Sequence, residues 1–204
     1  MNGAATPPTS SAPRTHGVFH ALRGALRHVG TDLRGLTVAV QGTGAVGSRL
    51  CALLRDAGAR LVVADVDAAS AAAVPGAEVV DPDAIHAVDA DVLSPCALGG
   101  TLNERTIPEI RARIVAGAAN NQLATPEDDA RLAARGITYV PDFLASAGGV
   151  TNGVSELDGY DRADVEARIE RIAATAEAVL AEAERRGIPS GEAAESLAME
   201  MATR

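Results

Sequence analysis

The sequence predicts an α/β protein with a doubly wound, mostly parallel sheet, an N-terminal helix and two C-terminal helices. Three observations lead to this fold class: short β-rich apolar runs recur along the chain, helical segments separate them, and the last quarter switches to long helical stripes. Short apolar strands that alternate with helices are typical of a parallel sheet covered on both faces. The 204 residues are enough for one such domain with additional helices.

The N-terminal part of the chain changes character within its first 30 residues. Residues 1–15 are rich in Pro, Ser, Thr and Ala, and we expect a flexible leader there. Residues 17–30 then predict an amphipathic helix, because apolar side chains recur three and four residues apart at Phe19, Leu22, Leu26 and Val29. The predicted organisation is therefore a leader over 1–15, a nucleotide-binding domain over 16–160 and a helical extension over 161–204.

The middle of the chain alternates strands with helices. Short apolar runs predict strands at 36–41, 61–64, 77–80, 91–94, 114–117 and 137–140. Helical spacing between them predicts helices at 45–57, 68–73, 82–87, 103–111 and 126–135. Gly58 stands where a glycine that ends a helix is expected.

Two long helical segments, 162–186 and 192–202, follow a loop signal at Ala147-Gly148-Gly149-Val150. They carry more apolar surface than a closed sheet of this size needs. We therefore expect them to pack either against the first helix or against another subunit.

Composition excludes several classes of function. The net charge of −9 argues against binding to nucleic acid or to an anionic membrane surface, because both need clustered cations. No apolar run approaches the ~18 residues that span a bilayer, and we see no secretory signal. The two cysteines make neither a disulfide framework nor a metal site. A cytoplasmic protein without a metal is expected.

The most specific local pattern is a glycine-rich loop. The pattern G-x-G-x-x-G is matched by Gly42-Thr43-Gly44-Ala45-Val46-Gly47, directly after a predicted strand and at the start of a predicted helix. Gly42 permits a tight turn, Gly44 lets a diphosphate approach the backbone, and Gly47 lets helix and strand pack closely. This context predicts a Rossmann-type dinucleotide-binding fold, with the phosphates at the N-terminus of the helix.

A carboxylate after the second strand indicates which dinucleotide is bound. Asp65 lies 18 residues after Gly47 and is followed by Val66, and we assign both to the cofactor site. An acid at this position accepts hydrogen bonds from the ribose hydroxyls and repels a 2′-phosphate, so NAD(H) is favoured over NADP(H). The alternatives are that Asp65 merely caps a helix, or that a cation such as Arg60 reverses the preference.

Four motifs together resemble a known family. They are Thr37-Val-Ala-Val-Gln-Gly-Thr-Gly44, Ser94-Pro-Cys-Ala-Leu-Gly99, Ala116-Gly-Ala-Ala-Asn-Asn-Gln-Leu123 and Pro141-Asp-Phe-Leu-Ala-Ser-Ala-Gly-Gly-Val150. From about Arg14 onward the chain resembles the C-terminal domain of the glutamate/leucine/phenylalanine/valine dehydrogenases, above all the leucine and phenylalanine branch.

The resemblance implies roles for residues at three further strand ends. Cys96 and Ala97 would lie beside the cofactor, and Asn120 and Asn121 would lie near the nicotinamide ribose and carboxamide. The segment facing the substrate would contain Ser146, Gly148, Gly149, Val150 and Val154. Ser146 stands where the family usually has Asn, and Thr151 where an aliphatic residue is common; these changes either make the pocket more polar or are neutral.

The larger departure from the family is chemical. The family's N-terminal domain supplies catalytic lysines and a catalytic aspartate, whereas this chain begins where that domain would end and has no lysine. The remaining acid or base candidate near the cleft is Asp142, although a role as a cap or turn residue is the stronger interpretation. We expect Cys96 to be a neutral packed residue, and His20 and His28 to lie on the solvated face of the first helix.

Three hypotheses follow. The first is an NAD(H)-dependent reductase of an imine or keto compound, with a small-molecule substrate and an active site that closes at a homodimer interface. The second is one half of a split amino-acid dehydrogenase, whose catalytic domain is a separate partner chain. The third is a non-catalytic NAD-binding module.

Overall fold

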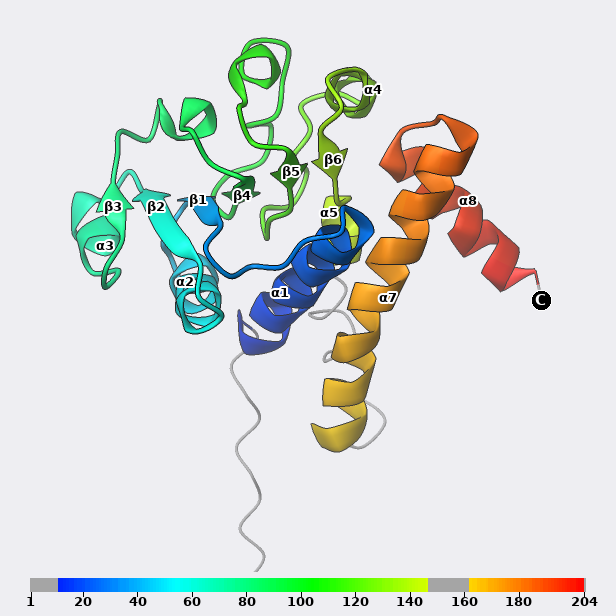
Figure 1. Ribbon diagram of the computed structural model, residues 1–204, viewed down its shortest axis with the longest axis horizontal. Helices are drawn as coiled ribbons and strands as arrows, with labels where there is room; N and C mark the ends of the chain where they lie inside the picture. Colours follow the sequence, from blue (N-terminus) through cyan, green and yellow to red (C-terminus); the bar gives the residue numbers. More distant parts are fainter. Residues whose placement is uncertain (1–10, 147–161, 204) are drawn as a thin grey trace, which may run out of the picture.

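The computed structural model describes residues 11–146 and 162–203, which form a single parallel sheet with helices on both sides (Figure 1). Its strands are β1 (Thr37–Gln41), β2 (Arg60–Ala64), β3 (Glu78–Val79), β4 (Val92–Pro95), β5 (Ile114–Val115) and β6 (Thr138–Tyr139). Its helices are α1 (Ser11–His28), α2 (Gly47–Asp56), α3 (Ala68–Ala72), α4 (Glu127–Ala134), α5 (Asp142–Ala145), α7 (Arg162–Arg186) and α8 (Ser190–Ala202).

The strand order is β3-β2-β1-β4-β5-β6, and every neighbouring pair is parallel. The chain starts at the centre with β1, winds outward to β3, returns to β4 beside β1 and winds outward again to β6. This order consists of two nucleotide-binding halves that meet between β1 and β4. The prediction of a doubly wound Rossmann-type fold is confirmed.

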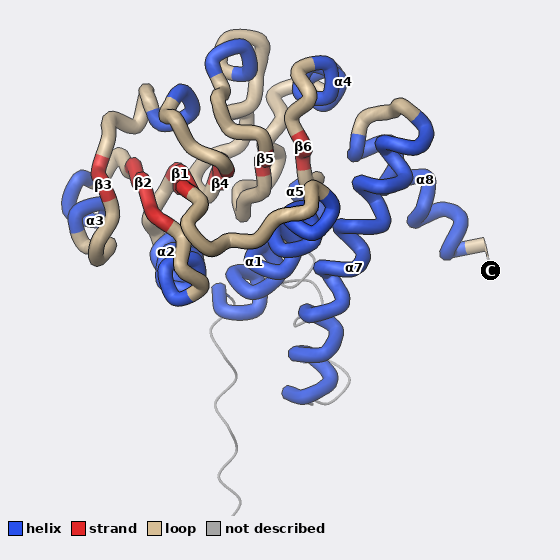
Figure 2. Tube along the Cα trace, viewed as in Figure 1, coloured by secondary structure: helices blue, strands red, loops and turns tan. Residues whose placement is uncertain are grey.

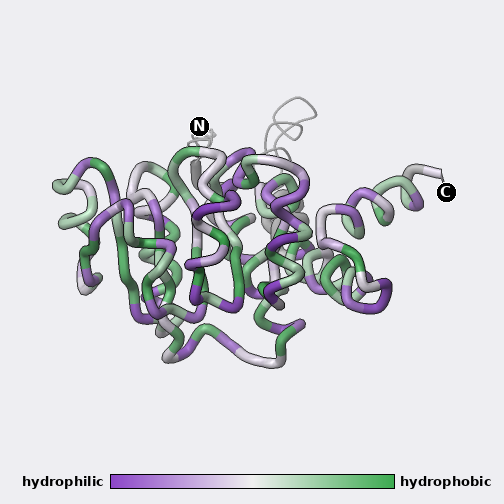
Figure 3. The backbone as a smooth tube through the Cα atoms, turned by 90° about the horizontal axis from the view of Figure 1, so that it is seen from above, coloured by the Kyte–Doolittle hydropathy of each residue, from purple (hydrophilic) through white to green (hydrophobic). Residues whose placement is uncertain are grey.

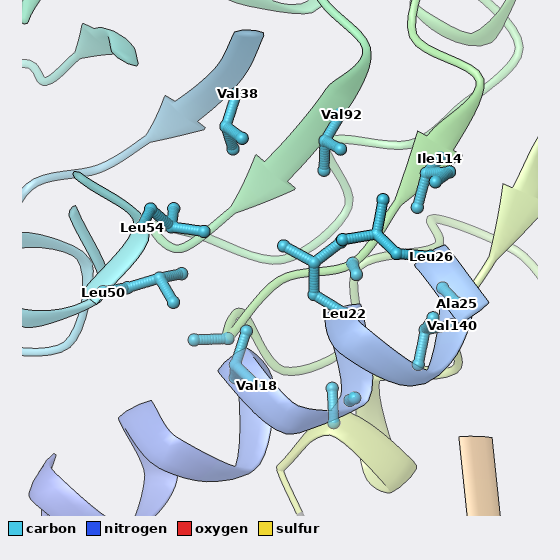
Figure 4. Packing of buried hydrophobic residues seen from close by; sticks show 14 of the residues in the cluster. Val18, Leu22, Ala25, Leu26, Val38, Leu50, Leu54, Val92, Ile114 and Val140 are labelled. Carbon is cyan, nitrogen blue, oxygen red and sulfur yellow. The ribbon is translucent and has the colours of Figure 1, made fainter. Parts of the chain in front are cut away.

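Alternating side chains of the strands supply two hydrophobic clusters, one on each face of the sheet. Val38 and Val40 of β1 belong to one cluster, and Ala39 between them belongs to the other. The first cluster is filled by side chains from α1 and α2, including Leu22, Leu26, Leu50 and Leu54, which converge on the strands in Figure 4. Because both faces are covered, the buried positions of the strands are mostly apolar, as expected for a buried parallel sheet.

Helix α7 packs along α1 on the outer side of the first cluster (Figure 1). The two helices approach so closely at Gly24 that a Cβ atom there would lie 2.3 Å from the carbonyl oxygen of Ala173 and 2.8 Å from the Cβ of Ala176. Glycine and alanine at the crossing permit this short distance between the helix backbones. Of the two alternatives for the long C-terminal helix, packing against the first helix is therefore the one observed.

Helix α8 is held at its beginning by a buried carboxylate of α4. Asp129 accepts hydrogen bonds from the backbone N–H of Gly191 (2.8 Å) and from the hydroxyl of Ser190 (3.4 Å). The far end of α8 extends away from the sheet, as seen from two directions in Figures 1 and 3, with Met199 and Met201 largely exposed. No helix in the described part of the chain is both long and apolar enough to cross a membrane.

Some predicted boundaries are wrong. Helix α1 begins at Ser11, so residues 11–15 of the expected leader are helical and Thr15 is buried. Pro13 fits because proline is tolerated in the first turn of a helix.

The expectation that His28 lies on a solvated face of the first helix is also wrong. Its side chain is only 17% exposed and lies 3.5 Å from Glu184 of α7.

Two predicted helices are short 3-10 turns instead. The segments 82–87 and 103–111 contain only η1 (Ile85–Ala87) and η2 (Ile107–Glu109), and Figure 2 shows these connections mainly as loop. At η2 the guanidinium of Arg135 binds the carbonyl oxygens of Ile107 and Ile110. The side chain that follows the last residue of α4 thus satisfies carbonyls that a longer helix would have satisfied internally.

The close crossing of α1 and α7 makes Gly24 a test of this packing. Gly24→Ala should lower the free energy of unfolding by about 1–3 kcal/mol, because the added methyl group overlaps the backbone of α7. At a helix position without tertiary contacts the same change would stabilise by about 1 kcal/mol. The sign can be measured by urea denaturation followed by far-UV circular dichroism, with Arg23→Ala on the exposed side of α1 as control.

Candidate dinucleotide-binding site

The glycine loop joins the carboxyl end of β1 to the first turn of α2. Gly42 has φ +95°, and its N–H donates to the carbonyl oxygen of Ala64 at the end of β2 (2.7 Å). A Cβ atom on Gly47 would lie 1.9 Å from the carbonyl oxygen of Gly42, whereas one on Gly44 would meet nothing within 4 Å. Thus Gly42 turns the chain, Gly47 permits close packing, and Gly44 leaves exposed backbone beside the start of α2.

The carboxylate of Asp65 is bound to this loop. Its Oδ2 accepts hydrogen bonds from the N–H (2.6 Å) and the hydroxyl (3.1 Å) of Thr43, and its Oδ1 accepts one from the N–H of Asp67 (2.9 Å). The N–H donors of Asp67 and Thr43 stabilise the charged form and lower the pKa of Asp65 below its usual value. Asp65 is therefore ionised at neutral pH while it remains partly accessible.

Two neighbours of Asp65 bear on the predicted cofactor preference. Val66 follows it directly and is 94% exposed, so its side chain is available to a ligand. Arg60, the cation named as an alternative, lies at the opposite end of β2, where its Nε donates to the hydroxyl of Thr37 (3.3 Å). Because the two ends of a strand lie at opposite edges of the sheet, Arg60 does not reach the carboxylate of Asp65.

The loop after β4 packs against the glycine loop. The N–H of Cys96 donates to the carbonyl oxygen of Gln41 (2.7 Å), and a Cβ atom on Gly42 would lie 2.8 Å from that of Ala97. Burial raises the pKa of the Cys96 thiol, whose sulfur lies 3.5 Å from the hydroxyl of Ser94. A raised thiol pKa agrees with the expectation of a neutral packed cysteine rather than a nucleophile.

Asn120 and Asn121 follow β5, the strand beside β4, at the same edge of the sheet. A Cβ atom on Gly99 would lie 2.6 Å and 2.7 Å from their two carbonyl oxygens, and the N–H of Gly100 donates to that of Asn121 (2.7 Å). Asn121 has φ +51° and is the one non-glycine residue with positive φ among those described. Asparagine tolerates this left-handed conformation better than most residues, and such conformations are concentrated at functional sites.

Asp142 is the first residue of α5, beside the same turn. Its Oδ1 accepts the N–H of Phe143 (2.7 Å) and its Oδ2 accepts the N–H of Gln122 (3.3 Å). The N-cap position of α5 is Pro141, so Asp142 acts as a turn residue rather than as the cap, and a catalytic role stays a prediction. The Ser146 hydroxyl is buried without a hydrogen-bond partner in the described part of the chain. The other predicted pocket residues, Gly148, Gly149, Val150 and Val154, lie outside the described residues.

One residue of the site was not singled out from the sequence. Gln122 is fully buried, and its amide group donates to the carbonyl oxygens of Gly117 (2.9 Å) and Ala119 (3.0 Å). Its presence in the Asn-Asn-Gln segment was the available signal. Nowhere in residues 11–146 and 162–203 do three or more His, Cys, Asp or Glu side chains gather as a metal site would require.

The sequence matches the family model of the Glutamate/Leucine/Phenylalanine/Valine dehydrogenases over residues 12–72 and 64–203. These two segments cover nearly the whole chain. The chain belongs to this family. The resemblance inferred from the four motifs is thereby confirmed, and the Rossmann-type nucleotide-binding fold agrees with it.

Individual family members are similar over the same region. The leucine dehydrogenase of Geobacillus stearothermophilus is 41% identical over 195 residues, which cover 93% of this chain and 53% of that protein. The crystal structure of L-tryptophan dehydrogenase from Nostoc punctiforme superposes with a TM-score of 0.91 at 40% identity, covering 95% of this chain and 61% of that one.

A more distant family member is the hetero-hexameric glutamate dehydrogenase from Thermus thermophilus, with a TM-score of 0.76 and 28% identity over 96% of this chain and 52% of that one. The chain spans about half the length of the curated relatives it matches.

Two glycines of the loop should respond differently to alanine. Gly47→Ala should reduce the free energy of unfolding by about 2 kcal/mol or more, because the methyl group meets the backbone of Gly42. Gly44→Ala should change it by less than about 0.5 kcal/mol, because the position is exposed and open. Urea denaturation of both variants checks this difference, and equal stability of the two would contradict the packing described here.

Proposed function

We propose that this chain binds NAD(H) along the carboxyl edge of its sheet, in preference to NADP(H), and serves an oxidoreduction at a C–N or keto group. The proposal depends on one observation: the exposed backbone at Gly44 and the ionised carboxylate of Asp65 belong to a single hydrogen-bonded loop. The first suits a diphosphate at a helix N-terminus, and the second suits ribose hydroxyls but repels a 2′-phosphate.

The remaining residues of the edge fit the other half of the cofactor. Dinucleotides lie across the point where the strand order reverses, here between β1 and β4. With the adenosine at Asp65, the nicotinamide half would extend over the ends of β4 and β5, beside Cys96, Ala97, Asn120 and Asn121. Bound NADH supplies the hydride. The chain's own residues would hold the dinucleotide and leave space for an acceptor near Ser146 and Asp142.

The chemistry we favour is reduction of an imine or keto compound, or its reverse. The chain has no lysine, and arginine stays protonated at neutral pH, so neither can act as a general base at the described edge. A preformed iminium accepts a hydride without prior proton removal, which suits a cleft whose carboxylate, Asp142, is already hydrogen-bonded. The homodimer and the cytoplasmic location remain predictions.

A second candidate is the cofactor half of an enzyme whose catalytic residues come from a partner chain. One observation favours it: a solved member of the family is a hetero-hexamer. The exposed methionines near the end of α8 would be available to such a partner. In a third candidate, a non-catalytic module, NADH would bind but no acceptor would be reduced.

The test is to titrate NADH, and separately NADPH, into the purified chain while following nicotinamide fluorescence, to which the tryptophan-free protein adds little background. We expect saturable binding of NADH at least about tenfold tighter than that of NADPH, equivalent to ~1.4 kcal/mol. Gly44→Ala should weaken NADH binding without loss of stability. Asp65→Asn should reduce the preference for NADH, whereas the matched variant Asp67→Asn should leave it unchanged.

Equal affinity for the two cofactors would contradict the role of Asp65, and no binding of either would contradict the proposal as a whole. Once binding is measured, a panel of cyclic imines and keto acids offered with NADH distinguishes the candidates. Turnover by the isolated chain supports the reductase. Binding without turnover, followed by activity when a second chain is added, supports the split enzyme.

A further inference from the structure

Gln122 connects the turn at Asn120 and Asn121 to three separate segments. Its side-chain amide donates to the carbonyl oxygens of Gly117 and Ala119, on the segment that leaves β5. Its backbone N–H donates to Asp142 of α5, and its backbone carbonyl accepts the N–H of Leu102 (3.0 Å) from the connection after β4. Four hydrogen bonds thus fix this residue from both sides.

The residue that precedes Gln122 has a strained backbone conformation. Asn121 directly precedes Gln122 and has φ +51°, a conformation that costs of the order of 1 kcal/mol or more unless the surroundings enforce it. By gathering the carbonyls of Gly117 and Ala119, the Gln122 amide closes the loop from β5 into a compact turn. This closure keeps Asn120 and Asn121 against Gly99.

The acceptor end of the same amide argues against a role in packing alone. The Oε1 atom of Gln122 is buried and has no hydrogen-bond partner in the described part of the chain. A buried polar atom without a partner costs roughly 1–3 kcal/mol. An apolar side chain of similar size would fill the volume without that cost, so the donor end of the amide is the part that the fold uses.

We propose that Gln122 is a positioning residue that sets the Asn120–Asn121 turn for the nicotinamide end of the cofactor, an inference that rests on the NAD(H) binding proposed above. Gln122 itself is fully buried and acts through Asn121. Its effect should therefore be confined to the part of the ligand that the turn contacts. The glycine loop and Asp65, which would hold the adenosine and the phosphates, do not hydrogen-bond to it.

The experiment compares NADH with ADP, which has the adenosine and both phosphates but neither the nicotinamide nor its ribose. Gln122→Met keeps the length of the side chain and removes its donors. We expect the Kd for NADH to rise about tenfold and the Kd for ADP to change less than about twofold. Leu180→Ala, in the α1–α7 layer away from this edge, is the control for lost stability; it should lower Tm without changing the ratio of the two Kd values.

A proportional change in both Kd values for Gln122→Met, or no change in either, would overturn the positioning role and leave the cofactor proposal intact. Failure of the unmodified chain to bind NADH would overturn both. If the variant does not fold, nitrogen-15 NMR of the unmodified chain gives the answer. The Gln122 side-chain amide and the Asn121 backbone amide should shift with NADH and not with ADP, and equal shifts with both ligands would overturn the inference.

Discussion

The close approach of α2 to the end of β1 is the constraint on which the rest of the site depends. With no room for a Cβ atom between Gly47 and the Gly42 carbonyl, the first turn of α2 lies directly against the strand end. This contact fixes where the N-terminus of α2 points. It also leaves Gly42 facing Ala97, so the loop after β4 adopts its position from the same packing. One backbone contact thereby aligns the two halves of the sheet at the point where its order reverses.

Along the carboxyl ends of the strands, each connection contacts the next one mainly through backbone atoms. Gly42 meets Ala97, Gly99 meets the Asn120–Asn121 turn, and the residue after this turn is bound by Asp142. Glycine stands at the first two of these approaches because any side chain there would separate the two connections. The arrangement explains why residues from four distant parts of the sequence form a continuous edge although few of their side chains contact one another.

The parts of the fold that follow local rules were predictable from the sequence. The strands could be located to within a few residues because their alternation serves two buried faces, and Gly42, Gly44 and Gly47 could be assigned separate roles from their spacing alone. Features set by contacts distant in sequence were not predictable. Gly24 looks like an ordinary helix residue until α7 lies against it, and the segment at 103–111 contains only a 3-10 turn because Arg135, just after α4, binds its carbonyls.

The same reasoning bears on the chemistry. Two carboxylates of the described edge are Asp65, bound to the glycine loop, and Asp142, bound to the Asn-Asn-Gln turn, and both already accept hydrogen bonds from backbone N–H groups. At Asp65 such donors stabilise the charged form and lower the pKa, which makes it a weak base. An edge of this kind is well prepared to bind and orient a dinucleotide and poorly prepared to remove a proton from an amino group. The acceptor must then arrive already activated, or a base must come from residues outside the described edge, and these are the two cases that the chemistry of the edge leaves open.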